Sequence, residues 1–112
     1  MLSSLTLSGN PIGNFGILTL AQVLPHSPLR ELYLSNIGMT TEGFQCLARV
    51  LRFTTSLTLL DISKNVLGYS GLNPLIDQLP YTQITNLNIK GSDRFHFIHY
   101  IQLSYKIQKW TI

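Results

Sequence analysis

The sequence of 112 residues contains a single cysteine, Cys46, which excludes an internal disulfide framework. A lone cysteine fits a reducing compartment, so we expect a cytoplasmic protein. No basic region followed by an apolar run lies near Met1, and a secretory signal is therefore not indicated. No stretch approaches the roughly 18–20 apolar residues that a membrane span needs, so we expect no membrane partner.

Charged residues are also scarce, at 12% of the chain. The five acidic residues are scattered, so no carboxylate pair suggests acid–base catalysis. A phosphate-binding GxxxxGK[ST] loop, a GxGxxG pattern and a Cys-x-x-Cys pair are all absent. His96 and His99 could share a metal ion, but only Asp93 is near them in the sequence, and a zinc site needs more ligands. We therefore expect no enzyme, no cofactor and no metal.

The net charge of +3 is confined to the end of the chain. Residues 1–89 carry four basic and four acidic side chains, whereas residues 90–112 carry four basic side chains and one acidic one. The main part of the chain is thus electrically balanced, which argues against a nucleic-acid-binding surface.

What the sequence does contain is a repeat of 27–28 residues. Units open at Leu2, Leu29 and Leu57, and a fourth opening at Ile84 then loses the pattern. Each opening reads apolar-x-x-apolar-x-apolar, and its last two apolar positions suit a short strand with one buried face. These positions are Leu2, Leu5, Leu7; Leu29, Leu32, Leu34; Leu57, Leu60, Ile62; and Ile84, Leu87, Ile89.

The second half of each unit has the spacing of a helix. A glycine follows the third apolar position by nine residues, at Gly16, Gly43 and Gly71, and suits a crowded entry into a helix. Apolar residues then recur at i, i+3, i+4 and i+7. They are Ile17, Leu20, Ala21, Leu24; Phe44, Leu47, Ala48, Leu51; and Leu72, Leu75, Ile76, Leu79.

Alternating strands and helices at this period predict an α/β solenoid with parallel strands joined by right-handed crossovers. We expect three full repeats plus a fourth strand in residues 1–89, and a divergent C-terminal tail or cap in residues 90–112. Three accounts of this tail remain open: a divergent cap, unrelated sequence joined to a truncated array, or a basic aromatic interaction tail. Neither a strand nor a helix is favoured there by the periodicity.

The pattern LxxLxLSGNPIGxxGxxxLAxxL resembles the ribonuclease-inhibitor type of leucine-rich repeat. This resemblance covers about residues 2–89, and it implies strands on a concave face and helices on a convex face. The ladder position of that family, usually Asn or Cys, is held by Asn10, Ile37, Asn65 and Ser92. Ile37 cannot make the hydrogen bonds of an asparagine. We therefore expect a weaker hydrogen-bonded connection between coils at this position.

In a fold of this kind, strand residues that alternate with the buried leucines face outward. We expect a protein partner to bind there, with Tyr33 as an aromatic anchor beside Glu31 and Asp61. The alternative interpretation is an ordinary solvated strand face. The candidate residues are Ser4, Thr6, Ser8, Glu31, Tyr33, Ser35, Leu59, Asp61, Ser63, Asn86, Asn88 and Lys90.

The leading functional hypothesis is a protein–protein interaction module, a part of a longer intracellular scaffold or sensor such as an innate-immune receptor. A regulator of a small GTPase or a nuclease inhibitor is the alternative that the resemblance implies, although the balanced charge does not favour it. A structural fragment without activity of its own is the third. We also expect that uncapped ends of the repeat array could self-associate.

Overall fold

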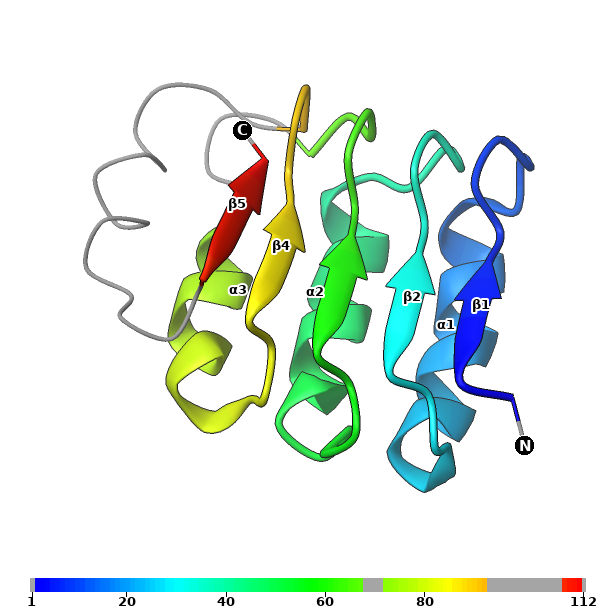
Figure 1. The fold of residues 1–112 in the computed structure, drawn as a ribbon. Coiled ribbons are helices and arrows are strands. Elements are labelled where there is room, and N and C mark those ends of the chain that lie inside the picture. Colours follow the sequence, from blue (N-terminus) through cyan, green and yellow to red (C-terminus); the bar gives the residue numbers. More distant parts are fainter. Residues whose placement is uncertain (1, 68–71, 93–107, 112) are drawn as a thin grey trace.

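The computed structural model describes residues 2–67, 72–92 and 108–111. Short parallel strands form one sheet whose order follows the chain, β1-β2-β3-β4-β5 (Figure 1). The strands are β1 Ser4–Thr6, β2 Glu31–Tyr33, β3 Leu59–Asp61, β4 Asn86–Asn88 and β5 Lys109–Thr111. Each repeat therefore forms one coil that lies beside the coils before and after it.

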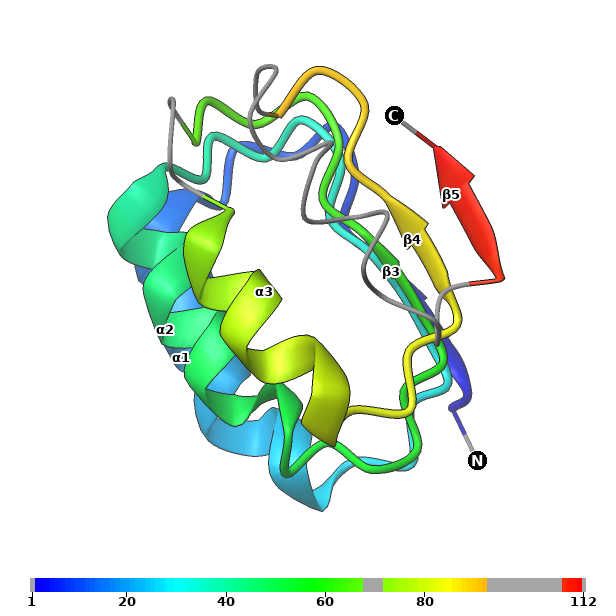
Figure 2. The same cartoon turned by 90° about the vertical axis from the view of Figure 1, so that its left-hand side faces the viewer.

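The helices α1 Gly13–Val23, α2 Thr41–Leu51 and α3 Asn73–Gln78 lie together on one side of the sheet (Figure 2). Short 3-10 helices, η1 Leu24–His26 and η2 Leu79–Tyr81, follow α1 and α3. This two-layer arrangement of parallel strands and helices confirms the predicted α/β solenoid. None of the helices in the described ranges is long and apolar enough to cross a membrane.

Two of the described α-helices, α1 and α3, end one residue before the apolar pattern does, whereas α2 includes its last apolar position, Leu51. α1 ends at Val23 and α3 ends at Gln78, so Leu24 and Leu79 belong to the 3-10 turns that also contain Pro25 and Pro80. A proline ring removes a backbone donor and clashes with the preceding turn, which stops the α-helix there. Pro74 lies in the first turn of α3, where its missing N–H costs little.

Gly43, the glycine at the entry of α2, lies against the preceding coil. A Cβ atom at this position would come within 2.8 Å of Asn14 Cγ on α1. Asn14 is held there, since its Oδ1 accepts the Thr40 backbone N–H at 2.9 Å and its Nδ2 donates to Thr40 Oγ1 at 2.7 Å. The close approach of two coils therefore requires the missing side chain. Gly71, the third glycine of the pattern, lies outside the described residues.

The hydrophobic core runs without interruption between the sheet and the helices. Almost all of the predicted strand and helix positions of the second, third and fourth units are buried in it. Its largest fully buried side chains include Phe44, Ile17, Leu24, Leu32, Leu34, Leu47, Leu51, Leu57, Leu60 and Ile62. Since one unit cannot enclose its own leucines, stacking is what removes them from water.

Asn65 connects neighbouring coils by several side-chain hydrogen bonds. Its Oδ1 accepts the backbone N–H groups of Ile37 at 3.1 Å and Met39 at 3.2 Å. Its Nδ2 donates to the carbonyl oxygen of Leu34 at 2.9 Å and to two carbonyl groups of its own coil. Ser92 partly plays this role one coil later, because its hydroxyl accepts the Asn65 N–H and donates to the Ile62 carbonyl.

The expected weak hydrogen-bonded connection lies between the first and second coils. Ile37 is fully buried and offers no polar side-chain atom to the first coil. The backbone N–H groups of Asn10 and Ile12 instead bond within their own turn, to the carbonyl oxygens of Leu7 at 3.2 Å and Asn10 at 2.8 Å. Asn36 does not compensate, since no side-chain hydrogen bond of Asn36 occurs in the described part of the chain.

The fifth strand was not predicted from the sequence. β5 pairs with β4 in parallel, with Trp110 opposite Leu87 in the backbone register. The N–H of Ile89 donates to the carbonyl oxygen of Thr111 at 2.7 Å. Residues 93–107, which carry His96 and His99, lie outside the described residues, so the three accounts of the tail stay open.

Candidate functional site

The candidate site is the face of the sheet that points away from the helices, called the concave face below. The central residue of each inner strand is buried beneath it, namely Leu32, Leu60 and Leu87. Side chains on either side of these leucines alternate to the opposite face because successive strand residues point in opposite directions. The sequence pattern therefore determines which side chains the concave face presents.

The strand register places the predicted residues in two rows across the sheet. The first row is Ser4, Glu31, Leu59 and Asn86, and the second is Thr6, Tyr33, Asp61 and Asn88. β5 extends both rows, by Lys109 and by Thr111. Sequence reasoning missed these two residues. The polar–apolar–polar triplet Lys109-Trp110-Thr111, which matches Asn86-Leu87-Asn88, was the available signal.

The third predicted row, Ser8, Ser35, Ser63 and Lys90, lies beyond the ends of the strands, where the chain turns. Ser8 Oγ accepts the Ser35 backbone N–H at 2.9 Å, and the Ser63 hydroxyl donates to Ser35 Oγ at 2.9 Å. Ser63 is only 4% exposed. The serine hydroxyls therefore hold neighbouring turns together, whereas Lys90 is exposed.

Tyr33 is the one aromatic side chain on the described concave face. Its hydroxyl donates to Glu31 Oε1 at 3.2 Å. Desolvation raises the pKa of Tyr33 above 10.0, and the negative charges of Glu31 and Asp61 raise it further. These three residues therefore form an acidic cluster with an aromatic ring at its centre.

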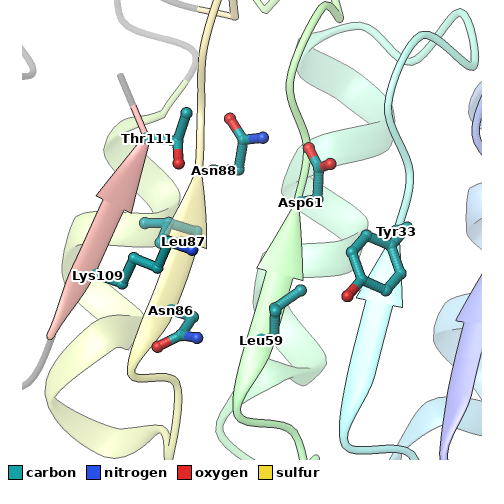
Figure 3. A pocket seen from close by; sticks show the side chains of 8 residues that line it. All are labelled: Tyr33, Leu59, Asp61, Asn86, Leu87, Asn88, Lys109 and Thr111. Atoms are coloured by element: carbon teal, nitrogen blue, oxygen red, sulfur yellow. The ribbon is translucent and has the colours of Figure 1, made fainter.

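A shallow hollow of about 220 Å³ lies between this cluster and the C-terminal edge of the sheet (Figure 3). It brings together five of the predicted residues and the two that were missed. Its lining consists of Tyr33, Leu59, Asp61, Asn86, Leu87, Asn88, Lys109 and Thr111. Ser4 and Thr6 on β1, and Glu31 beside Tyr33, lie outside that lining.

The polar side chains of the hollow make few hydrogen bonds to the described part of the chain. Asn88 Oδ1 accepts the Lys90 N–H at 3.1 Å, and Asp61 Oδ1 accepts the Ser63 N–H at 2.9 Å. The amide nitrogens of Asn86 and Asn88 and the second oxygen of Asp61 take part in no hydrogen bond within the described ranges. Lys109 is exposed, so its ammonium adds a cation at the opposite wall.

The hollow has no catalytic or metal-binding constellation within the described residues. No group of three or more His, Cys, Asp or Glu side chains could hold a metal ion there. Cys46 is a free, half-buried thiol on α2, which lies in the helix layer and not in the sheet. The chemistry that the concave face does offer is hydrogen bonding, charge and apolar contact.

Comparisons with known proteins agree with this fold. The family model described as "Leucine Rich repeat" matches residues 54–75. The chain is 37% identical over 86 residues to the mouse ribonuclease inhibitor, and 38% identical over 90 residues to human NACHT, LRR and PYD domains-containing protein 5. These matches cover 75% and 77% of this chain, but only 19% and 8% of the relatives.

A solved structure of leiomodin-1 actin-binding site 2 superimposes with a TM-score of 0.85. The superposition covers 97% of this chain and 69% of that chain, at 13% sequence identity, and so it shows the fold alone. The fold is that of a repeat module of the kind that binds proteins. The chain is a leucine-rich-repeat array of the ribonuclease-inhibitor type.

Proposed function

We propose that this array is a protein-interaction module that binds a segment of a partner protein in the concave hollow. The observation that supports this proposal is the hollow itself, in which the apolar surface of Tyr33 and Leu59 lies beside polar side chains of three neighbouring strands. The proposal includes the expected role as part of a larger intracellular scaffold or sensor, in the cytoplasm.

The hollow suits an extended peptide segment. The amide nitrogens of Asn86 and Asn88 can donate to peptide carbonyl groups, while Tyr33 and Leu59 give an apolar surface for one side chain. Asp61 and Glu31 at one end favour a basic residue, and Lys109 at the other end favours an acidic one. Opposite charges at the two ends would set the direction in which the segment lies.

Affinity is expected to be weak, with a dissociation constant on the order of micromolar, because the hollow is shallow and holds a single aromatic anchor. Peptides selected from a displayed library on the wild-type chain would supply the probe, and calorimetry would measure its affinity. We expect Tyr33→Ala and Asp61→Asn each to weaken binding about tenfold, a loss of about 1.4 kcal/mol. Asp61→Asn keeps an oxygen for the Ser63 N–H and removes only the charge.

Gln45→Ala is the matched control, because Gln45 is an exposed polar residue on α2 in the helix layer. Its affinity for the same peptide should equal that of the wild type. If Tyr33→Ala and Asp61→Asn both bind like the wild type, the concave face is not the binding site. Loss of binding in Gln45→Ala alone would place the site on the helices instead.

A nuclease inhibitor or a regulator of a small GTPase is the second candidate, favoured by the identity to the mouse ribonuclease inhibitor. The balanced charge of residues 1–89 does not favour it. Two assays separate it from the first candidate: hydrolysis of RNA by a pancreatic-type ribonuclease, and GTP hydrolysis by a panel of small GTPases. A concentration-dependent change in either rate would establish the regulatory role.

A further inference from the structure

The turns that lead from a helix to the next strand have the same geometry in three coils. In each of them a backbone N–H donates to the carbonyl oxygen of a buried leucine three residues earlier. The pairs are Ser27 to Leu24 at 3.0 Å, Thr54 to Leu51 at 3.1 Å and Thr82 to Leu79 at 3.1 Å. Residues 24–30, 51–58 and 79–85 therefore form one edge of the molecule, at the bottom of Figure 1, which we call the helix–strand edge.

An aromatic side chain follows each of these leucines by two residues. These side chains belong to His26, Phe53 and Tyr81, and all three are exposed. Phe53 is 60% exposed although its coil lies between two others, since α2 contacts both α1 and α3. Its exposure is therefore a property of the turn itself. Single exposed apolar residues are ordinary, but one ring in each of three stacked turns forms a row.

Arg52 links the second and third coils within this row. Its Cζ lies 4.4 Å from the centroid of the Tyr81 ring, and its Nε donates to Gln78 Oε1 at 2.8 Å. The ring and the amide together favour one orientation of the guanidinium. The terminal amino groups of Arg52 form neither a hydrogen bond nor an ion pair with the described residues. A guanidinium that is already oriented loses little conformational freedom when it binds a carboxylate.

The helix–strand edge is positively charged, although residues 1–89 as a whole are balanced. It contains two exposed arginines, Arg30 and Arg52, and neither Asp nor Glu. Glu31, which follows Arg30, belongs to the concave face, and Asp77 belongs to α3. A surface with charge of one sign attracts a partner of the opposite charge and disfavours one of the same charge.

We propose that the helix–strand edge binds an acidic linear segment of a partner protein that carries at least one large apolar side chain. A carboxylate of the segment accepts hydrogen bonds from the terminal amino groups of Arg52, in the bidentate geometry that a planar guanidinium favours. The apolar side chain packs on the ring of Phe53, and Arg30 attracts a second carboxylate. None of these residues lines the concave hollow, so this is a second site.

A single-stranded nucleic acid is the other partner that uses aromatic rings and arginines. Such a strand carries one phosphate per nucleotide, and its affinity comes largely from cations that neutralise several of them. The edge supplies two arginines over three coils. An acidic protein segment with separated carboxylates needs fewer cations, and the charge of the edge therefore favours the protein segment.

The probe is obtained on a chain whose hollow is disabled. A displayed library of random segments of about 12 residues, long enough to span three coils, is selected on the double variant Tyr33→Ala, Asp61→Asn. The enriched segments are synthesised, and calorimetry measures their affinity for the wild type. We expect segments rich in Asp and Glu with an aromatic or aliphatic residue, and a dissociation constant on the order of 10 µM. Binding here is thereby tested independently of binding in the hollow.

Two substitutions on the edge are each paired with a matched control. Arg52→Glu is compared with Arg49→Glu, since Arg49 is an exposed arginine of α2 outside the edge and the change in net charge is the same. Phe53→Ser is compared with Val66→Ser, since Val66 is an 81% exposed apolar residue at the other end of β3. We expect Arg52→Glu and Phe53→Ser each to weaken binding at least about tenfold, and both controls to stay within about twofold of the wild type.

Four results would overturn the proposal. The first is a library that yields no enriched segment, and the second is enrichment of basic or uncharged segments. The third is an equal loss of affinity in Arg49→Glu and Arg52→Glu, which shows that net charge and not this edge controls binding. The fourth is a uridine oligonucleotide that binds more tightly than the segments and is equally sensitive to Phe53→Ser, which makes the partner a nucleic acid. Circular dichroism checks folding, and if one edge variant loses its helical signal, the other decides.

Discussion

The pKa of Tyr33 depends on the neighbouring carboxylates of Glu31 and Asp61. It lies between two carboxylates on the concave face, and its hydroxyl donates to Glu31 at 3.2 Å. Desolvation comes first among the causes that raise its pKa, followed by the charge of Glu31 and its hydrogen bond, and then by the charge of Asp61. The protonated phenol is therefore the form that this face stabilises.

We expect Tyr33 to titrate above pH 10.0 and Glu31→Gln to lower its pKa toward that value, since the largest charge contribution is then removed. Carbon-13 NMR of labelled tyrosine follows the titration, and Tyr33→Phe assigns the signal. Above pH 10 the unfolded chain loses this proton before the folded chain does. Stability should therefore fall as the pH rises through the interval between the two pKa values.

Glu31→Gln leaves the desolvation of Tyr33 in place, so the pKa should move only part of the way. A tyrosine that titrates at the same pH in Glu31→Gln and in the wild type would show that the carboxylate has no influence. The hydrogen bond between Tyr33 and Glu31 would then not persist in solution.

The turns that follow the strands differ in their side-chain hydrogen bonds to neighbouring coils. Asn10 and Asn65 are the same residue type at the same position of the repeat. Within the described residues, Asn10 in the first coil donates to two carbonyl groups of its own turn, those of Leu7 and Ser8. Asn65 also bonds three backbone groups of the preceding coil, on Ile37, Met39 and Leu34. One asparagine is thus local and the other joins two coils.

We expect Asn65→Ala to cost roughly 3 kcal/mol or more of unfolding free energy, because several buried backbone groups lose their partners. Asn10→Ala is the matched control and should cost about 1 kcal/mol at most, since its bonds are local and exposed. Urea unfolding followed by circular dichroism measures both. Equal losses in the two variants would mean that the asparagine bonds between coils add nothing.

The described helices and strands form one row of coils, in which each helix and strand contacts those of the adjacent coils. Leu60 is fully buried at the centre of β3, with a coil on each side. Leu5 occupies the equivalent place in β1, is only half-buried, and has a coil on one side. Stability should therefore depend on the position of a coil in the row as well as on its sequence.

We expect Leu60→Ala to destabilise the molecule by about 3–5 kcal/mol, the range for a large cavity in a core. Leu5→Ala should cost about 1–2 kcal/mol, because part of its side chain is already in water. Denaturant unfolding at low protein concentration measures the difference and keeps any association small. If the two variants lose the same amount, neighbouring coils do not support one another.

The repeat made most of the fold predictable, because stacking demands the same apolar positions in every coil. Leu32, Leu60 and Leu87 lie at the strand centres for this reason. Tyr33 and Asp61 were predicted on the concave face because they alternate with these leucines. Ser63 was also predicted there, but its hydroxyl bonds Ser35, since the chain has already turned at that point.

The sequence by itself determined the period, the layers, the register of the first four strands and the charge balance of residues 1–89. Only the tertiary structure decided that Lys109 and Thr111 join the candidate site, because their strand is brought beside β4 from beyond the repeat. It also decided which polar atoms of the described residues bond a neighbouring coil, as those of Asn65 do. Periodicity describes contacts that every coil repeats. The contacts of β5 occur once, and they depend on the chain after the repeats coming back to pair with β4.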